Sequence, residues 1–206
     1  ASTPILFDQY VTVGEPSEAI DFVVRSHETR DTDQGTELVV ELKARGKPIH
    51  AAIRYVWEGD SPALRRFTAI RNSGSTAICL LDAELADYET NGAASEGFVG
   101  FPVHLNNQLF FGLAHPAGLC RGLAGRVRLT QFSGKTLNPG DTVELMEVVV
   151  GVAGEGQSPA AFRDHIAGRC RRVARKHDKP YALFEGCGTW DTEEEGSILS
   201  EEYVLK

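Results

Sequence analysis

Residues 36–59 read "TELVVELKARGKPIHAAIRYVWEG", and this segment decides the fold that we expect. Its first ten residues are typical of a β-strand, and Gly46-Lys47-Pro48 then turns the chain. Every second residue of the following stretch shares one apolar face: Ile49, Ala51, Ile53, Tyr55 and Trp57. The segment therefore predicts two neighbouring strands with one side facing a core.

Short apolar segments separated by turn signals continue to about residue 152. "LRRFTAIRN" and "AICLLDAELADYE" flank the turn "NSGST", and "GRVRLTQF" and "DTVELMEVVVGVA" follow later. A turn is expected at Pro139-Gly140, because proline presets φ and glycine accepts a positive φ. About ten strands at a spacing of roughly 8–12 residues predict an antiparallel β-sandwich.

A helix is predicted from Ser158 onward. The stretch "SPAAFRDHIAGRCRRVARKH" opens with serine as N-cap and proline at the first helical position. Phe162, Ile166 and Val173 mark one helical face. The basic run "RCRRVARK" falls in the last turns, where cations interact favourably with the helix dipole, so we do not interpret it as a phosphate site.

After Pro180 the pattern changes to one strand, one polar loop and one helix. "YALFEGCG" predicts the strand, and "LSEEYVLK" predicts a helix capped by Ser200. A single such unit cannot bury its strand, because parallel strands need neighbours and covering helices. We therefore expect other chains or a longer protein to supply the missing elements. The opening "ASTPILFDQY" has neither Met nor a signal segment, which suggests a processed or trimmed product.

Composition excludes several classes of partner. A net charge of −8 argues against nucleic acid and anionic membranes, and no segment reaches the roughly 20 apolar residues of a membrane span. The cysteines are scattered without a CxxC pair and predict buried or half-buried thiols at positions 79, 120, 170 and 187. The compartment, cytoplasmic or secreted, stays open.

Neither a metal nor a cofactor is expected. His104 and His115 are eleven residues apart, without His-x-His spacing and without a matching cysteine. "GEG" at residues 154–156 is followed by Gln157 and Ser158 instead of the Lys and Ser/Thr of a phosphate-binding loop.

Several segments together resemble one family. "YVWEGDSPALRRFTAIRNSGS" resembles a strand pair in the N-terminal β-sandwich domain of alpha-galactosidase (melibiase-like) glycoside hydrolases. "GFPVHLNNQLFFGLAHPAG", "GVAGEGQSPAAFRDHI" and "PYALFEGCGTWD" are similar to later segments of that group, in the same order. The sequence departs from the family pattern at Ala114, where an acid is usual, and in "GCGTWD", which suggests a divergent subfamily with another sugar.

The resemblance implies a galactose-mutarotase-like supersandwich over residues 1–153. A linker helix over 154–179 and the first βα unit of a (β/α)8 barrel over 180–206 would follow. Its catalytic carboxylates would lie beyond this chain, whose expected role is to brace the barrel and shape the sugar pocket. The implied partners are a galactose-like carbohydrate and the remaining barrel of the same protein, while homo-oligomerisation stays open.

Trp190 and Asp191 are the candidate sugar-binding residues. They follow a predicted barrel strand, and such enzymes place their sites at the C-terminal ends of strands. A tryptophan face packs against the apolar side of a sugar ring, and a carboxylate accepts two hydroxyls. Alternatively, Trp190 caps the barrel rim and Asp191 ties down its loop.

The segment "HLNNQLFFGLAHPAG" contains the other candidates. Phe110 and Phe111 are expected to point to opposite faces of one strand, so one fills the core and the other needs a second cover. We expect a neighbouring domain to supply that cover. Asn106 and His115, in the flanking loops, would then lie at a domain interface or pocket rim.

Three alternatives remain open on the sequence. A free-standing carbohydrate-binding module would bind sugar through the sandwich alone. A mutarotase-type epimerase would need a His and a Glu facing each other, for which His104, His115 and Glu96 are candidates. An interaction domain would show a large apolar patch without convergent polar groups.

Overall fold

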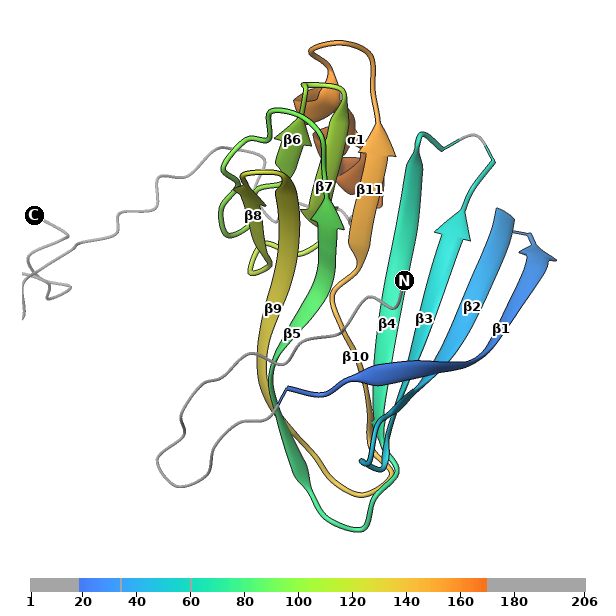
Figure 1. Cartoon of the computed structure of the whole chain (residues 1–206). Coiled ribbons are helices and arrows are strands. Elements are labelled where there is room, and N and C mark those ends of the chain that lie inside the picture. The colour runs from blue at the N-terminus through green and yellow to red at the C-terminus, as the bar shows by residue number, and fades with distance from the viewer. Residues whose placement is uncertain (1–18, 34, 60, 170–206) are drawn as a thin grey trace, which may run out of the picture. The chain divides into compact units, whose positions relative to one another are not determined.

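The structure is a computed structural model that describes residues 19–33, 35–59 and 61–169 (Figure 1). These residues form eleven strands and one helix. The larger, eight-stranded sheet has the order β1-β2-β3-β4-β11-β7-β6, with β10 paired to β4. Its strands are β1 Phe22–Thr32, β2 Gly35–Ala44, β3 Ile49–Trp57, β4 Ala63–Asn72, β6 Val103–Leu105, β7 Leu109–Leu113, β10 Thr142–Glu144 and β11 Val148–Val152.

The smaller sheet has three strands in the order β5-β9-β8 and lies over one face of the larger sheet (Figure 1). It contains β5 Ile78–Glu89, β8 Leu119–Leu123 and β9 Arg126–Leu137. The strand pairs of both sheets are antiparallel, as in the pairing of Ile53 with Thr68 between β3 and β4. The predicted antiparallel β-sandwich is therefore confirmed, and its finer assignment to the mutarotase-like type stays a prediction.

The predicted inward face of β3 is correct for most of its length. Ile49, Ala51 and Ile53 are buried, and Tyr55 packs against the core. Trp57, however, is 56% exposed, and its partner on β4, Leu64, is 41% exposed. The core therefore ends before this last row of β3, although the period-two pattern continues through it.

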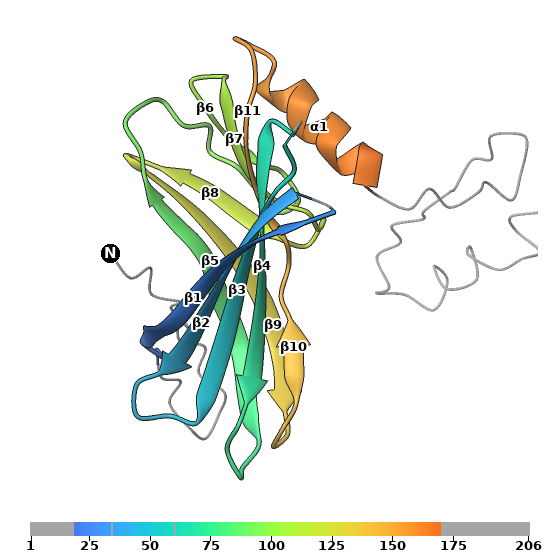
Figure 2. The same ribbon diagram turned by 90° about the vertical axis from the view of Figure 1, so that its right-hand side faces the viewer.

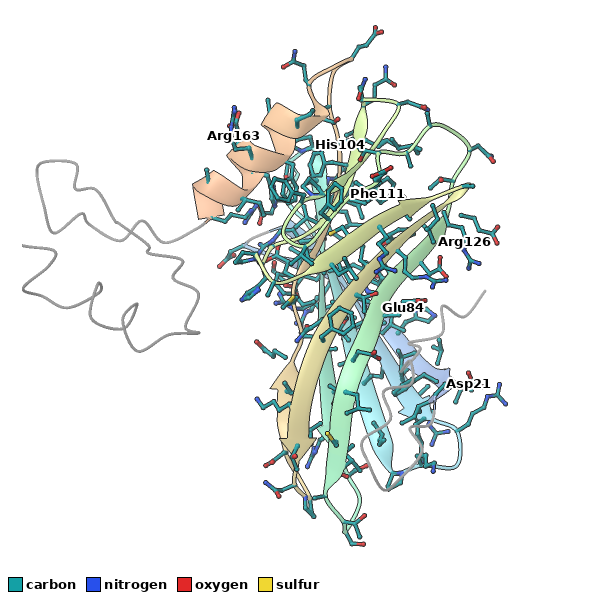
Figure 3. All side chains as sticks on the ribbon, turned by 90° about the vertical axis from the view of Figure 1, so that its left-hand side faces the viewer. Asp21, Glu84, His104, Phe111, Arg126 and Arg163 are labelled. Atoms are coloured by element: carbon teal, nitrogen blue, oxygen red, sulfur yellow. The ribbon has the colours of Figure 1, made fainter. Side chains whose placement is uncertain are left out.

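Two apolar cores lie on opposite sides of the larger sheet. The main core fills the space between the sheets, where Figure 3 shows Phe111. The second core is small and consists of Ala63, Phe110 and Val149 beneath the helix α1, Ser158–Arg169. Figure 2 shows α1 beside the end of β11, on the outer side of the larger sheet. We call this side, which faces away from the smaller sheet, the outer face.

The start of α1 differs from the prediction. The carbonyl of Gln157 accepts the N–H of Ala161 at 2.9 Å, which makes Gln157 the capping position. The Ser158 hydroxyl is buried and has no hydrogen-bond partner among the described residues, while the Ser158 N–H donates to the carbonyl of Asn107 at 3.4 Å. The β6–β7 turn thus holds Ser158 inside the first helical turn, so the predicted serine cap was wrong.

The thiol prediction is correct for Cys120, which is buried, and wrong for Cys79, which is exposed because it lies on the outward side of β5. Among the described residues, no helix has the length and apolar character needed to cross a membrane. The basic run beyond Arg169, the strand at 181–188 and the barrel unit lie outside the described residues. The boundaries 154–179 and 180–206 stay predictions.

Candidate docking surface

Three connecting segments meet beside β6 and β8. They are the β5–β6 loop (residues 90–102), the β6–β7 turn (106–108) and the β7–β8 loop (114–118). Ser95 joins the first loop to β6, because its N–H donates to the His104 carbonyl at 2.8 Å and its hydroxyl accepts the His104 N–H at 2.9 Å. The N–H of Gly100 donates to the carbonyl of Gly118 at 2.8 Å. Backbone bonds thus hold the three segments together as one loop cluster.

The most exposed apolar side chains of this cluster lie on a tight turn, Phe98-Val99-Gly100-Phe101, which we call the apolar turn. Phe98, Val99 and Phe101 are 63%, 55% and 66% exposed. The Phe101 N–H donates to the Phe98 carbonyl at 3.2 Å, and Gly100 has a φ of 78°, which favours glycine. Hydrogen bonds therefore fix a backbone whose apolar side chains stay in water.

Asn106, a predicted interface residue, holds the β5–β6 loop in place. It adopts a left-handed φ of 51°, and its Oδ1 accepts the N–H of Ala93 at 3.2 Å. Its own N–H donates to the Ala93 carbonyl at 3.1 Å. The observed role of Asn106 is thus to position the loop that carries the apolar turn.

His115, the second predicted rim residue, is exposed next to the apolar turn. Its Nδ1 accepts the N–H of Ala117 at 3.1 Å, which orders the β7–β8 loop locally. The neighbouring Pro116 carbonyl leaves no room for a side chain at Gly100, where a Cβ would lie 2.7 Å from that oxygen. The loop of His115 and the apolar turn are therefore in close backbone contact.

Phe110 and Phe111 point to opposite faces, as the sequence predicted. Phe111 lies in the main core, with its ring centroid 5.4 Å from that of Tyr88. Phe110 is fully buried under α1, where its ring meets that of Phe162 edge to face at 5.6 Å. The expected cover from a neighbouring domain is thus corrected: α1 of the same chain covers Phe110. The exposed aromatic rings of the cluster are those of Phe98 and Phe101.

Charged residues fasten α1 to the larger sheet. Arg65 on β4 binds Glu147 through two hydrogen bonds of 2.5 and 3.2 Å, and Glu58 through one of 3.0 Å. Arg169 in the last turn of α1 also pairs with Glu58. Hydrogen bonds from Arg169 and Arg65 hold the pKa of the Glu58 carboxyl below its usual range. Both ends of α1 are therefore attached to the sandwich.

Two histidines lie on the side of the sheet that carries α1. His104 is opposite Phe110 in the β6–β7 register and lies near the α1 end of the sandwich (Figure 3). Its Nδ1 and the Nε2 of His165 are buried, and neither has a hydrogen-bond partner in the described part of the chain. Burial lowers the pKa of both imidazoles, and Arg169 lowers that of His165 further. Burial therefore favours the neutral form of both side chains.

The remaining predicted residues are not assembled into a catalytic site. Trp190 and Asp191 lie outside the described residues. Within residues 19–169, as far as the structure describes them, no group of three or more His, Cys, Asp or Glu side chains could hold a metal ion. In the same part of the chain, no hydrogen bond or ion pair joins Glu96 to His104 or His115.

Phe98 and Val99 were missed by the sequence reasoning. The signal was the segment "GFVGFP", in which apolar residues lie between two glycines in a connection between strands. Glycines at such positions permit tight turns, and large apolar side chains on a turn tend to stay exposed. The pattern thus indicates an apolar surface presented on a turn, next to the phenylalanine pair Phe110-Phe111.

The sequence matches no protein-family model and no curated protein. Among solved structures, the fold is similar to the galactosidase domain of alpha-galactosidase-sucrose kinase AgaSK. The TM-score is 0.52 at 12% identity, over 69% of this chain and 29% of that chain. The alpha-galactosidase from Lactobacillus brevis gives a TM-score of 0.50 at 12% identity, over 72% of this chain and 31% of that chain.

These identities are low, so the similarity concerns the fold. The chain spans less than a third of either alpha-galactosidase that it matches. The resemblance seen in the sequence is thus confirmed at the level of architecture: the described residues have the fold of the β-sandwich part of alpha-galactosidases.

Proposed function

We propose that this chain is the non-catalytic β-sandwich domain of an alpha-galactosidase-like glycoside hydrolase. In this role it braces the catalytic (β/α)8 barrel of the same protein and helps to shape the sugar pocket. The observation that carries the proposal is the apolar turn, which exposes Phe98, Val99 and Phe101 on a hydrogen-bonded backbone.

An exposed apolar group of this kind favours contact with another protein surface. Burying a phenylalanine side chain stabilises a contact by about 1.5–3 kcal/mol, and aromatic residues are enriched in interfaces. The matched alpha-galactosidases are more than three times as long as the region they share with this chain, which supports a covering domain from the same protein. We propose that the barrel covers the apolar turn.

The proposal also assigns roles to the predicted rim residues and to the predicted sugar-binding residues. Asn106 orders the β5–β6 loop and His115 lies in the adjoining loop, so both are proposed to form the rim of the docking surface. Trp190 and Asp191 follow the sandwich in the sequence and are proposed to contact a galactose-like sugar at the mouth of the barrel.

The proposal is tested in the protein that carries the sandwich and the barrel together. Replacing Phe98 and Phe101 by Ser should separate one calorimetric unfolding transition into two, because docking couples the two domains. Val24→Ser serves as the matched control, since Val24 is 54% exposed on β1, outside the loop cluster. A single, unshifted transition in the double variant would refute docking through this turn.

The non-catalytic role has its own measurement. The chain alone, incubated with an aryl α-galactoside, should release no phenol above the buffer rate. If the activity that releases phenol elutes together with the folded chain in gel filtration, the chain is itself an enzyme.

A further inference from the structure

The outer face of the larger sheet differs between its two ends. Near α1 its charges are paired: Arg30 and Arg54 both bind Glu37, at 2.9 and 2.8 Å, and Arg65 binds Glu147. Arg54 also stacks over the ring of Phe67, at 4.4 Å from the centroid. The charged groups at this end of the face thus satisfy one another.

The other end of this face contains a hollow with a volume of about 280 Å³. It lies across β2, β3, β4 and β10, and Figure 2 shows β10 beside the end of β4 that is remote from α1. Ala52 and Ala69 are paired in register between β3 and β4 and contribute two methyl groups to its lining. The hollow exists because two small residues lie side by side where the flanking residues are long.

Five polar residues line the hollow, of which Ser73 is already engaged, because its hydroxyl donates to the Pro48 carbonyl at 2.8 Å; the other four surround this alanine pair. Glu41 lies in the same row, opposite Ala52, whereas His50, Arg71 and Thr142 form the next row along the strands. Successive rows on one face are about 7 Å apart, and β2 and β4 are separated by two strand spacings, or about 10 Å. The backbones of Glu41 and Arg71 are therefore too far apart for an easy direct pair, which leaves space between the two charges.

These four side chains contrast with the charges near α1. In the described part of the chain, Glu41, His50, Arg71 and Thr142 form no side-chain hydrogen bond or ion pair. Their chemistry is complementary: the carboxylate only accepts, the guanidinium only donates, and the imidazole and hydroxyl do both. One end of the face is internally satisfied, and the other presents free donors and acceptors around an apolar floor.

We propose that this hollow is a binding site for a neutral, monosaccharide-sized polyol. A ring with several hydroxyls donates to Glu41 and accepts from Arg71 at the same time, while its C–H face packs on Ala52 and Ala69. An anion would be repelled by Glu41 and a cation by Arg71, so the opposite charges select a neutral ligand. Ligand sites usually enclose about 300–1,000 Å³, so this hollow suits one small ring better than a chain of rings.

The inference does not depend on the proposed docking function. The hollow and the loop cluster use different residues, and the loop cluster lies at the end of the sandwich with α1, whereas the hollow lies at the end with β10 (Figures 1 and 2). Binding at the hollow can therefore fail while docking succeeds, and the reverse.

The test is a titration of the ¹⁵N-labelled chain with D-galactose, D-glucose and myo-inositol, followed by amide chemical shifts. Shifts should concentrate on Ala52, Ala69, Arg71 and Thr142. Ala69→Leu fills the hollow and should abolish them. Arg71→Met and Glu41→Gln should each weaken binding about tenfold or more, because each removes a charge-assisted hydrogen bond.

The controls lie on the same face. Glu144→Gln is matched to Glu41→Gln, since Glu144 is paired in register with Ala69 but does not line the hollow. Lys43→Met is matched to Arg71→Met, since Lys43 is paired with His50. Neither control should change the titration by more than about twofold.

Several outcomes would overturn the proposal. They are no shifts with any of the three polyols, shifts at other residues, or shifts that persist in a folded Ala69→Leu variant. Inorganic phosphate that moves the same amides while the polyols do not would show an anion site and would also refute it. If Ala69→Leu loses the native spectrum, Arg71→Met against Lys43→Met decides the question.

Discussion

Phe110 and Phe162 meet edge to face beneath α1, with 5.6 Å between their ring centroids. This contact packs α1 against the outer face of the larger sheet. Strand β7, which carries Phe110, therefore has an apolar core on each of its two faces. The absence of a side chain at Gly112 leaves space for this contact, because a Cβ at this position would lie 2.4 Å from the Phe162 ring. Phe162→Ala should therefore lower the free energy of unfolding by about 2 kcal/mol, less than a fully buried phenylalanine, because Phe162 is partly exposed. Urea denaturation measures this, and a change below about 0.5 kcal/mol would contradict the packing.

A substitution at Gly151 tests the same core from the other side. A Cβ at this position would lie 2.0 Å from the Phe110 ring, so Gly151→Ala must displace that ring or the strand. The expected loss of stability is about 1–3 kcal/mol, as for other overpacked cores. Gly154→Ala is the matched control, since its nearest neighbour would be the Gln157 side chain at 3.7 Å. Equal unfolding midpoints for the two variants would show that β11 is not close-packed on Phe110.

The half-buried His165 predicts a pH dependence of stability. Burial is the largest cause that lowers the pKa of His165 in the folded state, and Arg169 is the next. Arg65 lowers this pKa as well, whereas Glu147 and Glu58 raise it. The unfolded chain therefore binds a proton below about pH 6.5 that the folded chain does not bind, so stability is full above this pH and falls as the pH decreases toward the folded pKa. His104 contributes with the same sign.

The variant His165→Gln isolates this effect. Its free energy of unfolding should fall less between pH 7 and pH 5.5 than that of the unchanged chain, because glutamine does not take up the proton. Parallel pH profiles for the variant and the unchanged chain would exclude His165 as the source.

The two described thiols should differ in reactivity. Burial raises the pKa of the Cys120 thiol to about 11, so very little thiolate is present at pH 8, whereas Cys79 is exposed. Brief alkylation of the native chain with iodoacetamide should modify Cys79 and leave Cys120 intact until denaturant is added. Peptide mass spectrometry reads both sites in one sample, and equal labelling of the native chain would show that Cys120 is accessible.

The sequence predicted the faces of the strands better than what covers them. Period two placed Ile49, Ala51 and Ile53 inside and separated Phe110 from Phe111, because alternation follows from strand geometry alone. It did not predict that α1 covers Phe110, because alternation says which side is apolar and not which element packs there. The cap at Ser158 failed for a related reason: a distant carbonyl, that of Asn107, takes up its N–H.

The candidate sites were less accessible to sequence reasoning. Glu41, His50, Arg71 and Thr142 are far apart in the sequence and meet only through the register of four strands. The pairing register of strands that are distant in the sequence depends on the whole sheet, so no local sequence pattern predicts the hollow. The apolar turn was closer to prediction, since "GFVGFP" is a local signal, but its exposure depends on the bonds that hold Gly100 and Phe101.

Strand β4 has a consequence for how this chain tolerates changes in length. Its outer side presents, at alternate positions, Ala63 beneath α1, Arg65 in the ion pairs and Ala69 in the hollow, while Ile70 faces the main core. Inserting a single residue in the middle of β4 would send Ile70 into water and a polar neighbour into the core. Both cores and the hollow thus depend on the same alternation of side chains between the two faces of β4. Insertions are expected to be tolerated in the turn at residues 73–77 and selected against within β4, which a library of single-residue insertions sorted by folding would reveal.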